Sequence, residues 1–221
     1  MRKPVIAIDG PAGAGKSTVS RRLAAELGLT YLDTGAMYRM LALATRRSAV
    51  SPEDGGEVEL ILSRIEIGFG PNGEAMLQHQ DVSQDIRTPD IAERASTASV
   101  HPEVRRRMVA LQQEMVEKGG VVLEGRDATT VIAPGAEVKV YLTASLEERA
   151  RRRTLDFSAQ GKSEPFSDVR EQIENRDHRD ITRSESPLKV AEDAKVIDSA
   201  NLSIDEVVAR IADLYRAALV E

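Results

Sequence analysis

Residues 10–17 read Gly-Pro-Ala-Gly-Ala-Gly-Lys-Ser, and this stretch decides the fold. It fits the pattern G-x-x-x-x-G-K-[ST] of a phosphate-binding loop. Residues 5–8 before it form a short apolar run, which is typical of a buried parallel strand. Residues 18–27 after it carry apolar side chains at helical spacing. The segment therefore predicts a strand, a phosphate-binding loop and a helix in succession.

The residue types in this loop suit an anionic ligand. Glycines lack a Cβ atom, so consecutive backbone N–H groups can converge on phosphate oxygens. The following helix directs its positive N-terminus at the same anion. Lys16 is expected to reach the β- and γ-phosphates, and the Ser17 hydroxyl to ligate Mg²⁺. The alternative is a glycine-rich turn that binds no nucleotide. The predicted nucleotide-binding residues are Gly10, Pro11, Ala12, Gly13, Ala14, Gly15, Lys16, Ser17 and Thr18.

Composition restricts the class of protein. A chain of 221 residues with 41% hydrophobic and 30% charged residues suits one α/β domain with a small insertion. A net charge of −6 argues against a general nucleic-acid or membrane-surface binder. The absence of cysteine excludes disulfides, thiolate nucleophiles and zinc–thiolate sites. No apolar run approaches the roughly 20 residues of a membrane span, so we expect a cytoplasmic protein without membrane or nucleic-acid partners.

The order of short apolar runs predicts a parallel sheet with one insertion. Four further runs, near residues 29–32, 121–123, 138–142 and 194–198, alternate with helical patterns, as in βαβ units. Between residues 58 and 97 the hydrophobic period changes to two, and Asn-Gly at 72–73 separates two alternating runs. This interval is expected to form a small antiparallel unit, acting either as decoration or as a flap over a second substrate.

Charged residues follow the ends of two predicted strands. Asp33-Thr34-Gly35 ends the second, with Thr34 expected as the N-cap of the next helix and Arg39 in its second turn. Gly125-Arg126-Asp127 ends the third. Ligands of open α/β sheets bind at this edge. The alternatives are an ordinary exposed arginine at 39 and an Arg–Asp ion pair at 126–127.

Two helices carry arginine in informative positions. In the helix predicted over 168–183, an apolar face begins at Val169 and Ile173 and continues as Arg176, Asp180 and Arg183, which suggests a helix that leaves the core to line a cleft. The alternative is a solvated helix with ion pairs along it. Residues 105–107 are all arginine and point in three directions, so at most two can face one site.

These features suit phosphoryl transfer between two phosphorylated substrates. Arginine forks and Mg²⁺ neutralise the equatorial oxygens of the transferred group. A phosphate acceptor is already ionised near neutral pH and needs no general base. This agrees with the three histidines, which are far apart in sequence and receive no catalytic role.

Four motifs in order resemble the bacterial cytidylate kinase family. They are residues 8–17, residues 32–39, Gly125-Arg126-Asp127 and Arg176-Asp177-His178-Arg179-Asp180. The resemblance runs from about residue 4 to the end and includes the insertion. It implies an ATP- and Mg²⁺-dependent conversion of CMP or dCMP to the diphosphate, in pyrimidine nucleotide metabolism. It also implies a five-stranded parallel P-loop kinase core (1–57, 98–148 and 186–221), a monophosphate-binding insertion (58–97) and a helical lid (149–185).

The resemblance also implies roles for individual residues. Arg39, Arg126 and Arg183 would hold the acceptor phosphate, and Asp180 with Arg176 the sugar hydroxyls. Ser96, Arg105 and Asp127 would read the cytosine edge, and Thr34 would offer a hydroxyl where the family often has serine. The expected catalytic residues are Lys16, Arg126, Arg176 and Arg183.

One departure concerns the loop after Asp127. The family usually continues with an apolar residue and Gly-Thr, whereas this chain has Ala128-Thr129-Thr130. A β-branched residue restricts φ at position 129, so a shift of the loop is expected.

Two rival functions remain open at this point. The first is another P-loop kinase, acting on UMP or on a small alcohol, which would need a base near the γ-phosphate. The second is a nucleotide-binding switch protein. We further expect a monomer whose segment 158–167, between two arginine-rich helices, allows lid closure.

Overall fold

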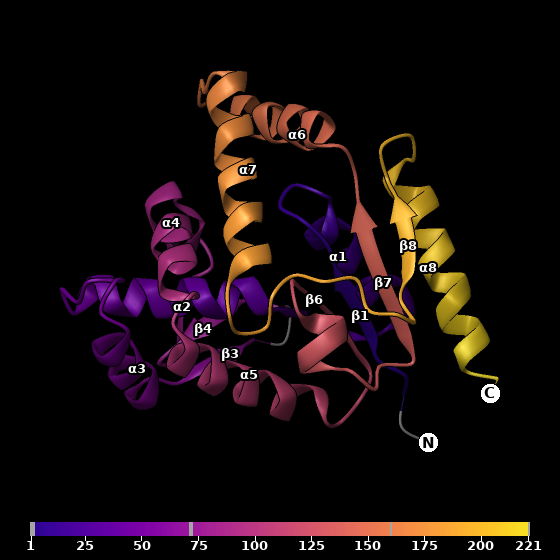
Figure 1. Cartoon of the computed structure of the whole chain (residues 1–221). Coiled ribbons are helices and arrows are strands. Elements are labelled where there is room, and N and C mark those ends of the chain that lie inside the picture. The colour runs from indigo at the N-terminus through magenta and orange to yellow at the C-terminus, as the bar shows by residue number, and fades with distance from the viewer. Residues whose placement is uncertain (1–2, 71–72, 160, 221) are drawn as a thin grey trace.

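A computed structural model describes residues 3–70, 73–159 and 161–220. Its main sheet has five parallel strands in the order β2-β6-β1-β7-β8. The strands are β1 (Ile6–Asp9), β2 (Thr30–Asp33), β6 (Val121–Gly125), β7 (Val138–Thr143) and β8 (Lys195–Asp198). Figure 1 shows helices on both sides of this sheet. The predicted α/β class and five-stranded parallel sheet are confirmed.

The central strands are apolar on both faces, so successive residues enter different cores. Ala7 packs into the core beneath α2 (Thr34–Arg47) and α5 (Pro102–Val116). Ile6 and Ile8 pack into the opposite core, beneath α1 (Lys16–Leu27) and α8 (Ile204–Ala218). Both cores are built along the same four residues of β1, which fixes where the phosphate-binding loop emerges from the sheet.

The insertion contains the predicted antiparallel unit. Strands β3 (Ile67–Phe69), β4 (Ala75–Leu77) and β5 (Gln80–Asp81) form it, with Ile67 opposite Leu77. The predicted turn residues 71 and 72 lie outside the described residues. The flanking helices are α3 (Gly55–Arg64), the short η1 (Asp85–Arg87) and α4 (Pro89–Ala98). Their buried apolar side chains belong to the same core as α2 and α5, so the insertion packs continuously onto one face of the sheet.

The start of α2 corrects one expectation. Asp33, not Thr34, is the N-cap, because its carboxylate accepts the Ala36 N–H at 2.8 Å. Thr34 is the first helical residue, and its hydroxyl donates to the Glu124 carbonyl at 2.6 Å. The carboxylate of a residue at the strand end was the better acceptor for the helix N-terminus.

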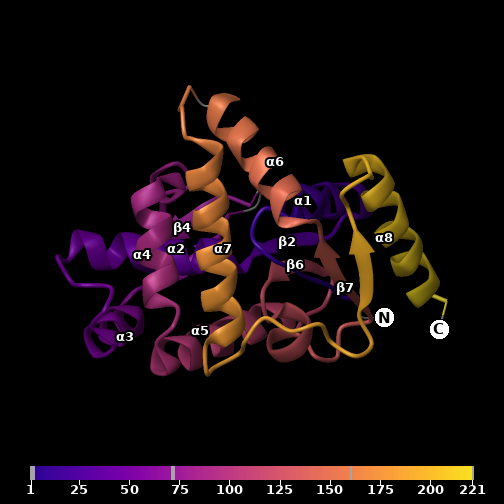
Figure 2. The same ribbon diagram turned by 45° about the horizontal axis from the view of Figure 1, so that its top comes forward.

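Two long helices stand over the carboxyl ends of the strands. They are α6 (Leu146–Ala159) and α7 (Phe166–Thr182). Figures 1 and 2 both show α7 between α4 and the main sheet. Val169 and Ile173 of α7 are buried against Phe157 of α6 and Ala12 of the loop. The apolar part of the predicted face thus fastens α7 to α6, and the charged part lies beyond it. The division into core, insertion and lid domains stays a prediction.

No helix in the described part of the chain is long and apolar enough to cross a membrane.

Candidate active site

The phosphate-binding loop lies between the end of β1 and the start of α1. Gly10 is required because a Cβ at this position would lie 1.9 Å from the Leu142 carbonyl oxygen. Gly15 precedes α1 with a φ of 92°, a left-handed conformation that glycine adopts without strain. Ser17 and Thr18 are exposed at the first turn of α1, so their hydroxyls and the helix N-terminus are accessible to a ligand.

The Lys16 side chain folds back onto this loop. Its Nζ donates to the carbonyls of Gly10 and Pro11, both at 2.7 Å, and the residue is buried. Burial, followed by the nearby Arg126 guanidinium, lowers the pKa of Lys16 to about 7. An anionic phosphate beside it would favour the charged ammonium. A bound anion would therefore stabilise the charged form of this lysine.

A group of arginines lies at the end of β6 and along and just after α7, and Arg126 and Arg176 act on Lys16 of the loop. Arg126 Nε donates to Asp180 Oδ2 at 2.8 Å, and Arg183 Nη1 lies 3.3 Å from Asp180 Oδ1. Arg176 lies on the same face of α7, where burial and then Arg126 lower its pKa to about 10. The charged residues predicted to lie on one face of α7 are therefore together with Arg126. Asp180 pairs with both Arg126 and Arg183, and Arg183 also lies 3.9 Å from Asp127.

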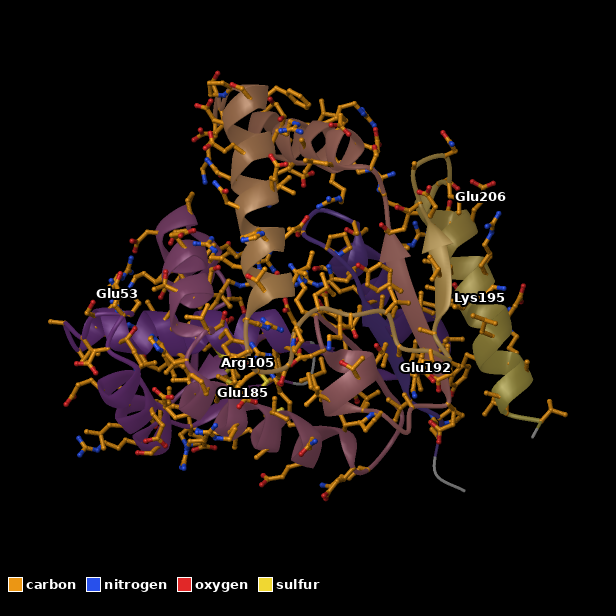
Figure 3. The ribbon with its side chains drawn as sticks, viewed as in Figure 1. Glu53, Arg105, Glu185, Glu192, Lys195 and Glu206 are labelled. Carbon is orange, nitrogen blue, oxygen red and sulfur yellow. The ribbon has the colours of Figure 1, made fainter. Side chains whose placement is uncertain are left out.

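Asp127 and Arg105 form a buried ion pair beside this group. Arg105 Nη2 donates to Asp127 Oδ2, and the Arg105 side chain is 2% exposed. Its guanidinium also lies 5.4 Å from the centre of the Tyr38 ring. Figure 3 shows Arg105 near the C-terminal end of α7. Arg106 and Arg107 are exposed, so only one arginine of the triplet points inward, as the helical spacing predicted.

Two further residues predicted to bind substrate, Arg39 and Ser96, have no hydrogen bond or ion pair to this group in the described part of the chain. Arg39 Nη2 donates to Asp33 Oδ2 at 3.0 Å and is half-buried at the same edge of the sheet. Ser96 lies half-buried on α4. Within the described residues, no side-chain hydrogen bond joins Ser96 to Arg105 or Asp127. A chain of contacts therefore joins Arg105, Asp127, Arg183, Asp180 and Arg126, whereas Ser96 makes no such contact among the described residues.

Residues 6–217 match the sequence model of the family described as cytidylate kinase. The chain belongs to the cytidylate kinase family. A cytidylate kinase of Caldicellulosiruptor bescii is 44% identical over 218 residues, which cover 97% of this chain and 96% of that protein. One of Mycobacterium leprae is 46% identical over 213 residues, covering 96% and 95%.

Longer members of the cytidylate kinase family also match. A bifunctional pantoate ligase/cytidylate kinase of Prochlorococcus marinus is 45% identical over 225 residues, which cover 100% of this chain but 46% of that protein. The chain thus spans less than half the length of such bifunctional relatives. A solved structure of an uncharacterised protein from Eubacterium ventriosum has the same fold, with a TM-score of 0.54, 11% identity and coverage of 97% of this chain and 99% of that one.

Several buried polar residues at this site were assigned no role from the sequence. Glu124 precedes the predicted Gly-Arg-Asp motif, and its Oε1 accepts the Tyr31 hydroxyl at 2.5 Å. Burial, and next the nearby Asp33 carboxylate, raise the pKa of Glu124. Asp9 ends β1 and is fully buried. Both are carboxylates at the carboxyl end of a strand, and the strand pattern that identified Asp33 and Asp127 could have found them.

Two further missed residues, Arg149 and Asp177, contact the loop itself. Arg149 Nη1 donates to the Ala12 carbonyl at 2.8 Å, and Asp177 Oδ1 accepts the Ala12 N–H at 2.9 Å. They are 28 residues apart and come from α6 and α7. No local spacing pairs them, so this contact could not be predicted from the sequence.

Proposed function

We propose that the chain transfers the γ-phosphoryl group of ATP to CMP and dCMP. The observation that carries the proposal is the gathering of Lys16, Arg126 and Arg176 around one loop, with the pKa of Lys16 lowered to about 7 and that of Arg176 to about 10. Like charges held this close are costly unless anions lie between them. Two phosphorylated substrates would supply those anions. Membership of the cytidylate kinase family supports the same reaction.

The reaction needs an attacking and a leaving oxygen in line with the transferred phosphorus. An acceptor-phosphate oxygen would form the new P–O bond as the bond to the β–γ bridging oxygen breaks, releasing ADP. Lys16 and Arg126 would hold the donor phosphates and the transferred group. Arg39 and Arg183 would hold the acceptor phosphate. This assignment needs no proton acceptor, because the attacking oxygen is already ionised.

The rival reaction with a small alcohol would need a general base. Asp33 is one carboxylate at the sheet edge, and both of its oxygens are engaged. One accepts the Ala36 N–H at 2.8 Å and the other Arg39 Nη2 at 3.0 Å. The helix N-terminus and Arg39 therefore already occupy both oxygens of this carboxylate. These contacts favour the phosphate acceptor.

A magnesium ion fits the donors near the loop as a companion of ATP. The described residues contain no cluster of three or more His, Asp or Glu side chains that could hold a metal ion. Magnesium in phosphoryl-transfer enzymes takes few protein ligands and relies on substrate phosphates. The exposed Ser17 hydroxyl would be a ligand, with the buried Glu124 carboxylate behind it. When bound, the ion neutralises charge on the β- and γ-phosphate oxygens.

The nucleobase of the acceptor would be selected by Asp127. Its carboxylate can accept from the exocyclic amine of cytosine, a group that uracil lacks. Arg105 holds this carboxylate from the side of α5. In the same assignment, Asp180 with Arg176 would bind the sugar hydroxyls, and Ser96 would help to read the cytosine edge. Arg183 Nη2 lies 3.9 Å from Asp127 Oδ1, which would join phosphate binding to base binding.

The test is a turnover panel with ATP and Mg²⁺. CMP and dCMP should react fastest among CMP, dCMP, UMP, AMP, GMP and shikimate in a coupled assay for ADP release. The D127A variant should raise the KM for CMP far more than the KM for ATP. Equal turnover of all monophosphates would defeat the cytosine assignment. ADP release without any acceptor would instead favour the nucleotide-binding switch. Monomeric, cytoplasmic action remains a prediction from the sequence.

A further inference from the structure

The Asp9 carboxylate joins the two loops of the site. Asp9 is the last residue of β1, directly before Gly10, and it is fully buried. Its Oδ1 accepts the Ala128 N–H at 2.9 Å, and its Oδ2 accepts the Thr129 N–H at 2.8 Å. The start of the phosphate-binding loop is therefore bonded to the loop that follows Asp127.

A third donor to Asp9 comes from the Thr129 side chain. The Thr129 hydroxyl donates to Asp9 Oδ2 at 2.6 Å, and Thr129 is 1% exposed. Burial raises the pKa of Asp9, and the hydrogen bond from the Thr129 hydroxyl acts in the opposite direction. A charge-assisted hydrogen bond of this kind is stronger than a neutral one and resists movement of the group that donates it. A glycine at position 129 would leave the carboxylate with two backbone donors only.

The Thr129 bond acts on the backbone that presents Asp127. Asp127 precedes a short π-helical turn, η2 (Ala128–Ile132), in which its carbonyl accepts the N–H groups of Val131 and Ile132 at 2.9 and 3.0 Å. Only Ala128 separates Asp127 from Thr129. Because the stiff β-branched side chain is buried, the hydroxyl has little freedom to follow a displaced backbone. Asp9 thus holds the turn on one side, and Arg105 holds the Asp127 carboxylate on the other.

We propose that Thr129 is a positioning residue for base selection, whose hydroxyl fixes the Asp127 carboxylate through Asp9. The proposal deepens the function proposed above and rests on Asp127 reading the cytosine amine. It assigns a task to the residue that departs from the family pattern. The bond from the Thr129 hydroxyl to Asp9 is the contact through which it would act.

The experiment compares three variants of the full chain. T129V removes the hydroxyl while keeping the shape of the side chain, and T129S keeps the hydroxyl. The matched control is T130V, because the Thr130 hydroxyl is buried without a hydrogen-bond partner among the described residues. The readouts are KM and kcat for CMP and UMP, KM for ATP, and the thermal midpoint.

We expect T129V to raise the KM for CMP about tenfold, the loss typical of one charge-assisted hydrogen bond. The preference for CMP over UMP should fall by a similar factor, while the KM for ATP stays within about twofold. T129S should restore the native values, and T130V should match the native protein. A T129V variant with native selectivity overturns the proposal. So does an equal rise in the KM values for CMP and ATP, because it would indicate a structural role.

A double-mutant cycle with D127N separates this proposal from the function on which it rests. If Thr129 acts through Asp127, T129V should have little further effect on CMP selectivity in the D127N background. Additive effects overturn the proposal for Thr129 alone. A D127N variant with a native KM for CMP removes Asp127 from the base site, and the proposal for Thr129 falls with it.

Discussion

Arg149 and Asp177 enclose the peptide unit of Ala12 between them. Arg149 Nη1 donates to Asp177 Oδ2 at 2.5 Å and to the Ala12 carbonyl at 2.8 Å, while Asp177 Oδ1 accepts the Ala12 N–H at 2.9 Å. Both side chains are about one-tenth exposed. One buried ion pair therefore fastens α6 and α7 to the phosphate-binding loop, so the conformation of the loop and the placement of these helices depend on each other.

Neutralising Asp177 should destabilise the protein and weaken ATP binding. In D177N the Arg149 guanidinium loses its buried counter-charge, which costs about 3 kcal/mol. Urea unfolding measures the loss, and the KM for ATP should rise more than that for CMP. The matched control is D213N, which neutralises an aspartate of the exposed Asp213–Arg216 pair and should leave stability unchanged. Native stability in D177N would contradict the prediction.

ATP binding should take up a proton above neutral pH. The pKa of Lys16 is lowered to about 7, and a bound phosphate raises it again. Above pH 7 the free protein holds Lys16 neutral, so binding must protonate it and affinity should weaken by up to about tenfold per pH unit. Calorimetry at pH 8 in Hepes and Tris measures the uptake as a difference in apparent enthalpy.

The same shift sets the pH dependence of stability without nucleotide. The unfolded chain binds more protons at Lys16 than the folded chain between pH 7 and about pH 10, so Lys16 makes the unfolding free energy increase with pH in this window. The K16M variant should lack both this increase and the proton uptake on ATP binding. An identical slope in K16M and the native protein would refute the assignment.

Replacing Arg176 should slow transfer without weakening the fold. Burial and the nearby Arg126 disfavour the positive charge of Arg176 and lower its pKa. The R176M variant removes this unfavourable charge, so it should not lower the thermal midpoint. Arg176 is one of the expected catalytic residues, so losing its guanidinium should reduce kcat by about 10³-fold. Quenched-flow measurement of a single turnover tests whether the chemical step has slowed. The control is R170M on the same helix, where the exposed Arg170 pairs with Glu174. Equal kcat in R170M and R176M would remove Arg176 from the reaction.

Hydrogen exchange should report closure of the predicted lid. Arg179 of α7 contacts Glu93 of α4 at 2.8 and 3.3 Å, so α7 reaches across to the insertion. Amides in 149–185 should exchange more slowly when CMP and a non-hydrolysable ATP analogue are both bound, because closure excludes water from the transferred group. Either ligand alone should have a smaller effect. Exchange that remains fast across this interval with both bound would rule out closure.

The sequence by itself determined the class of the fold, the nucleotide loop and the helical face that carries Arg176 and Asp180. These features are encoded locally, because strand and helix periods and the glycine pattern act over a few neighbouring residues. The capping of α4 by Thr88 and of α8 by Ser203 is local in the same sense. Thr34 was misplaced by one residue, because Asp33 competed for the same helix terminus.

Only the tertiary structure decided which charged groups meet. Asp9 contacts Thr129 across 120 residues, and Asp177 contacts Ala12 across 165. Such pairs depend on the strand order β2-β6-β1-β7-β8, which places β6 beside β1, and on the packing of α7 over the loop. Neither the strand order nor this packing can be derived from the local periodicity of hydrophobic residues. A sequence can specify that a carboxylate stands at the end of a strand, but its partner is whatever the neighbouring strand or helix brings within hydrogen-bond distance.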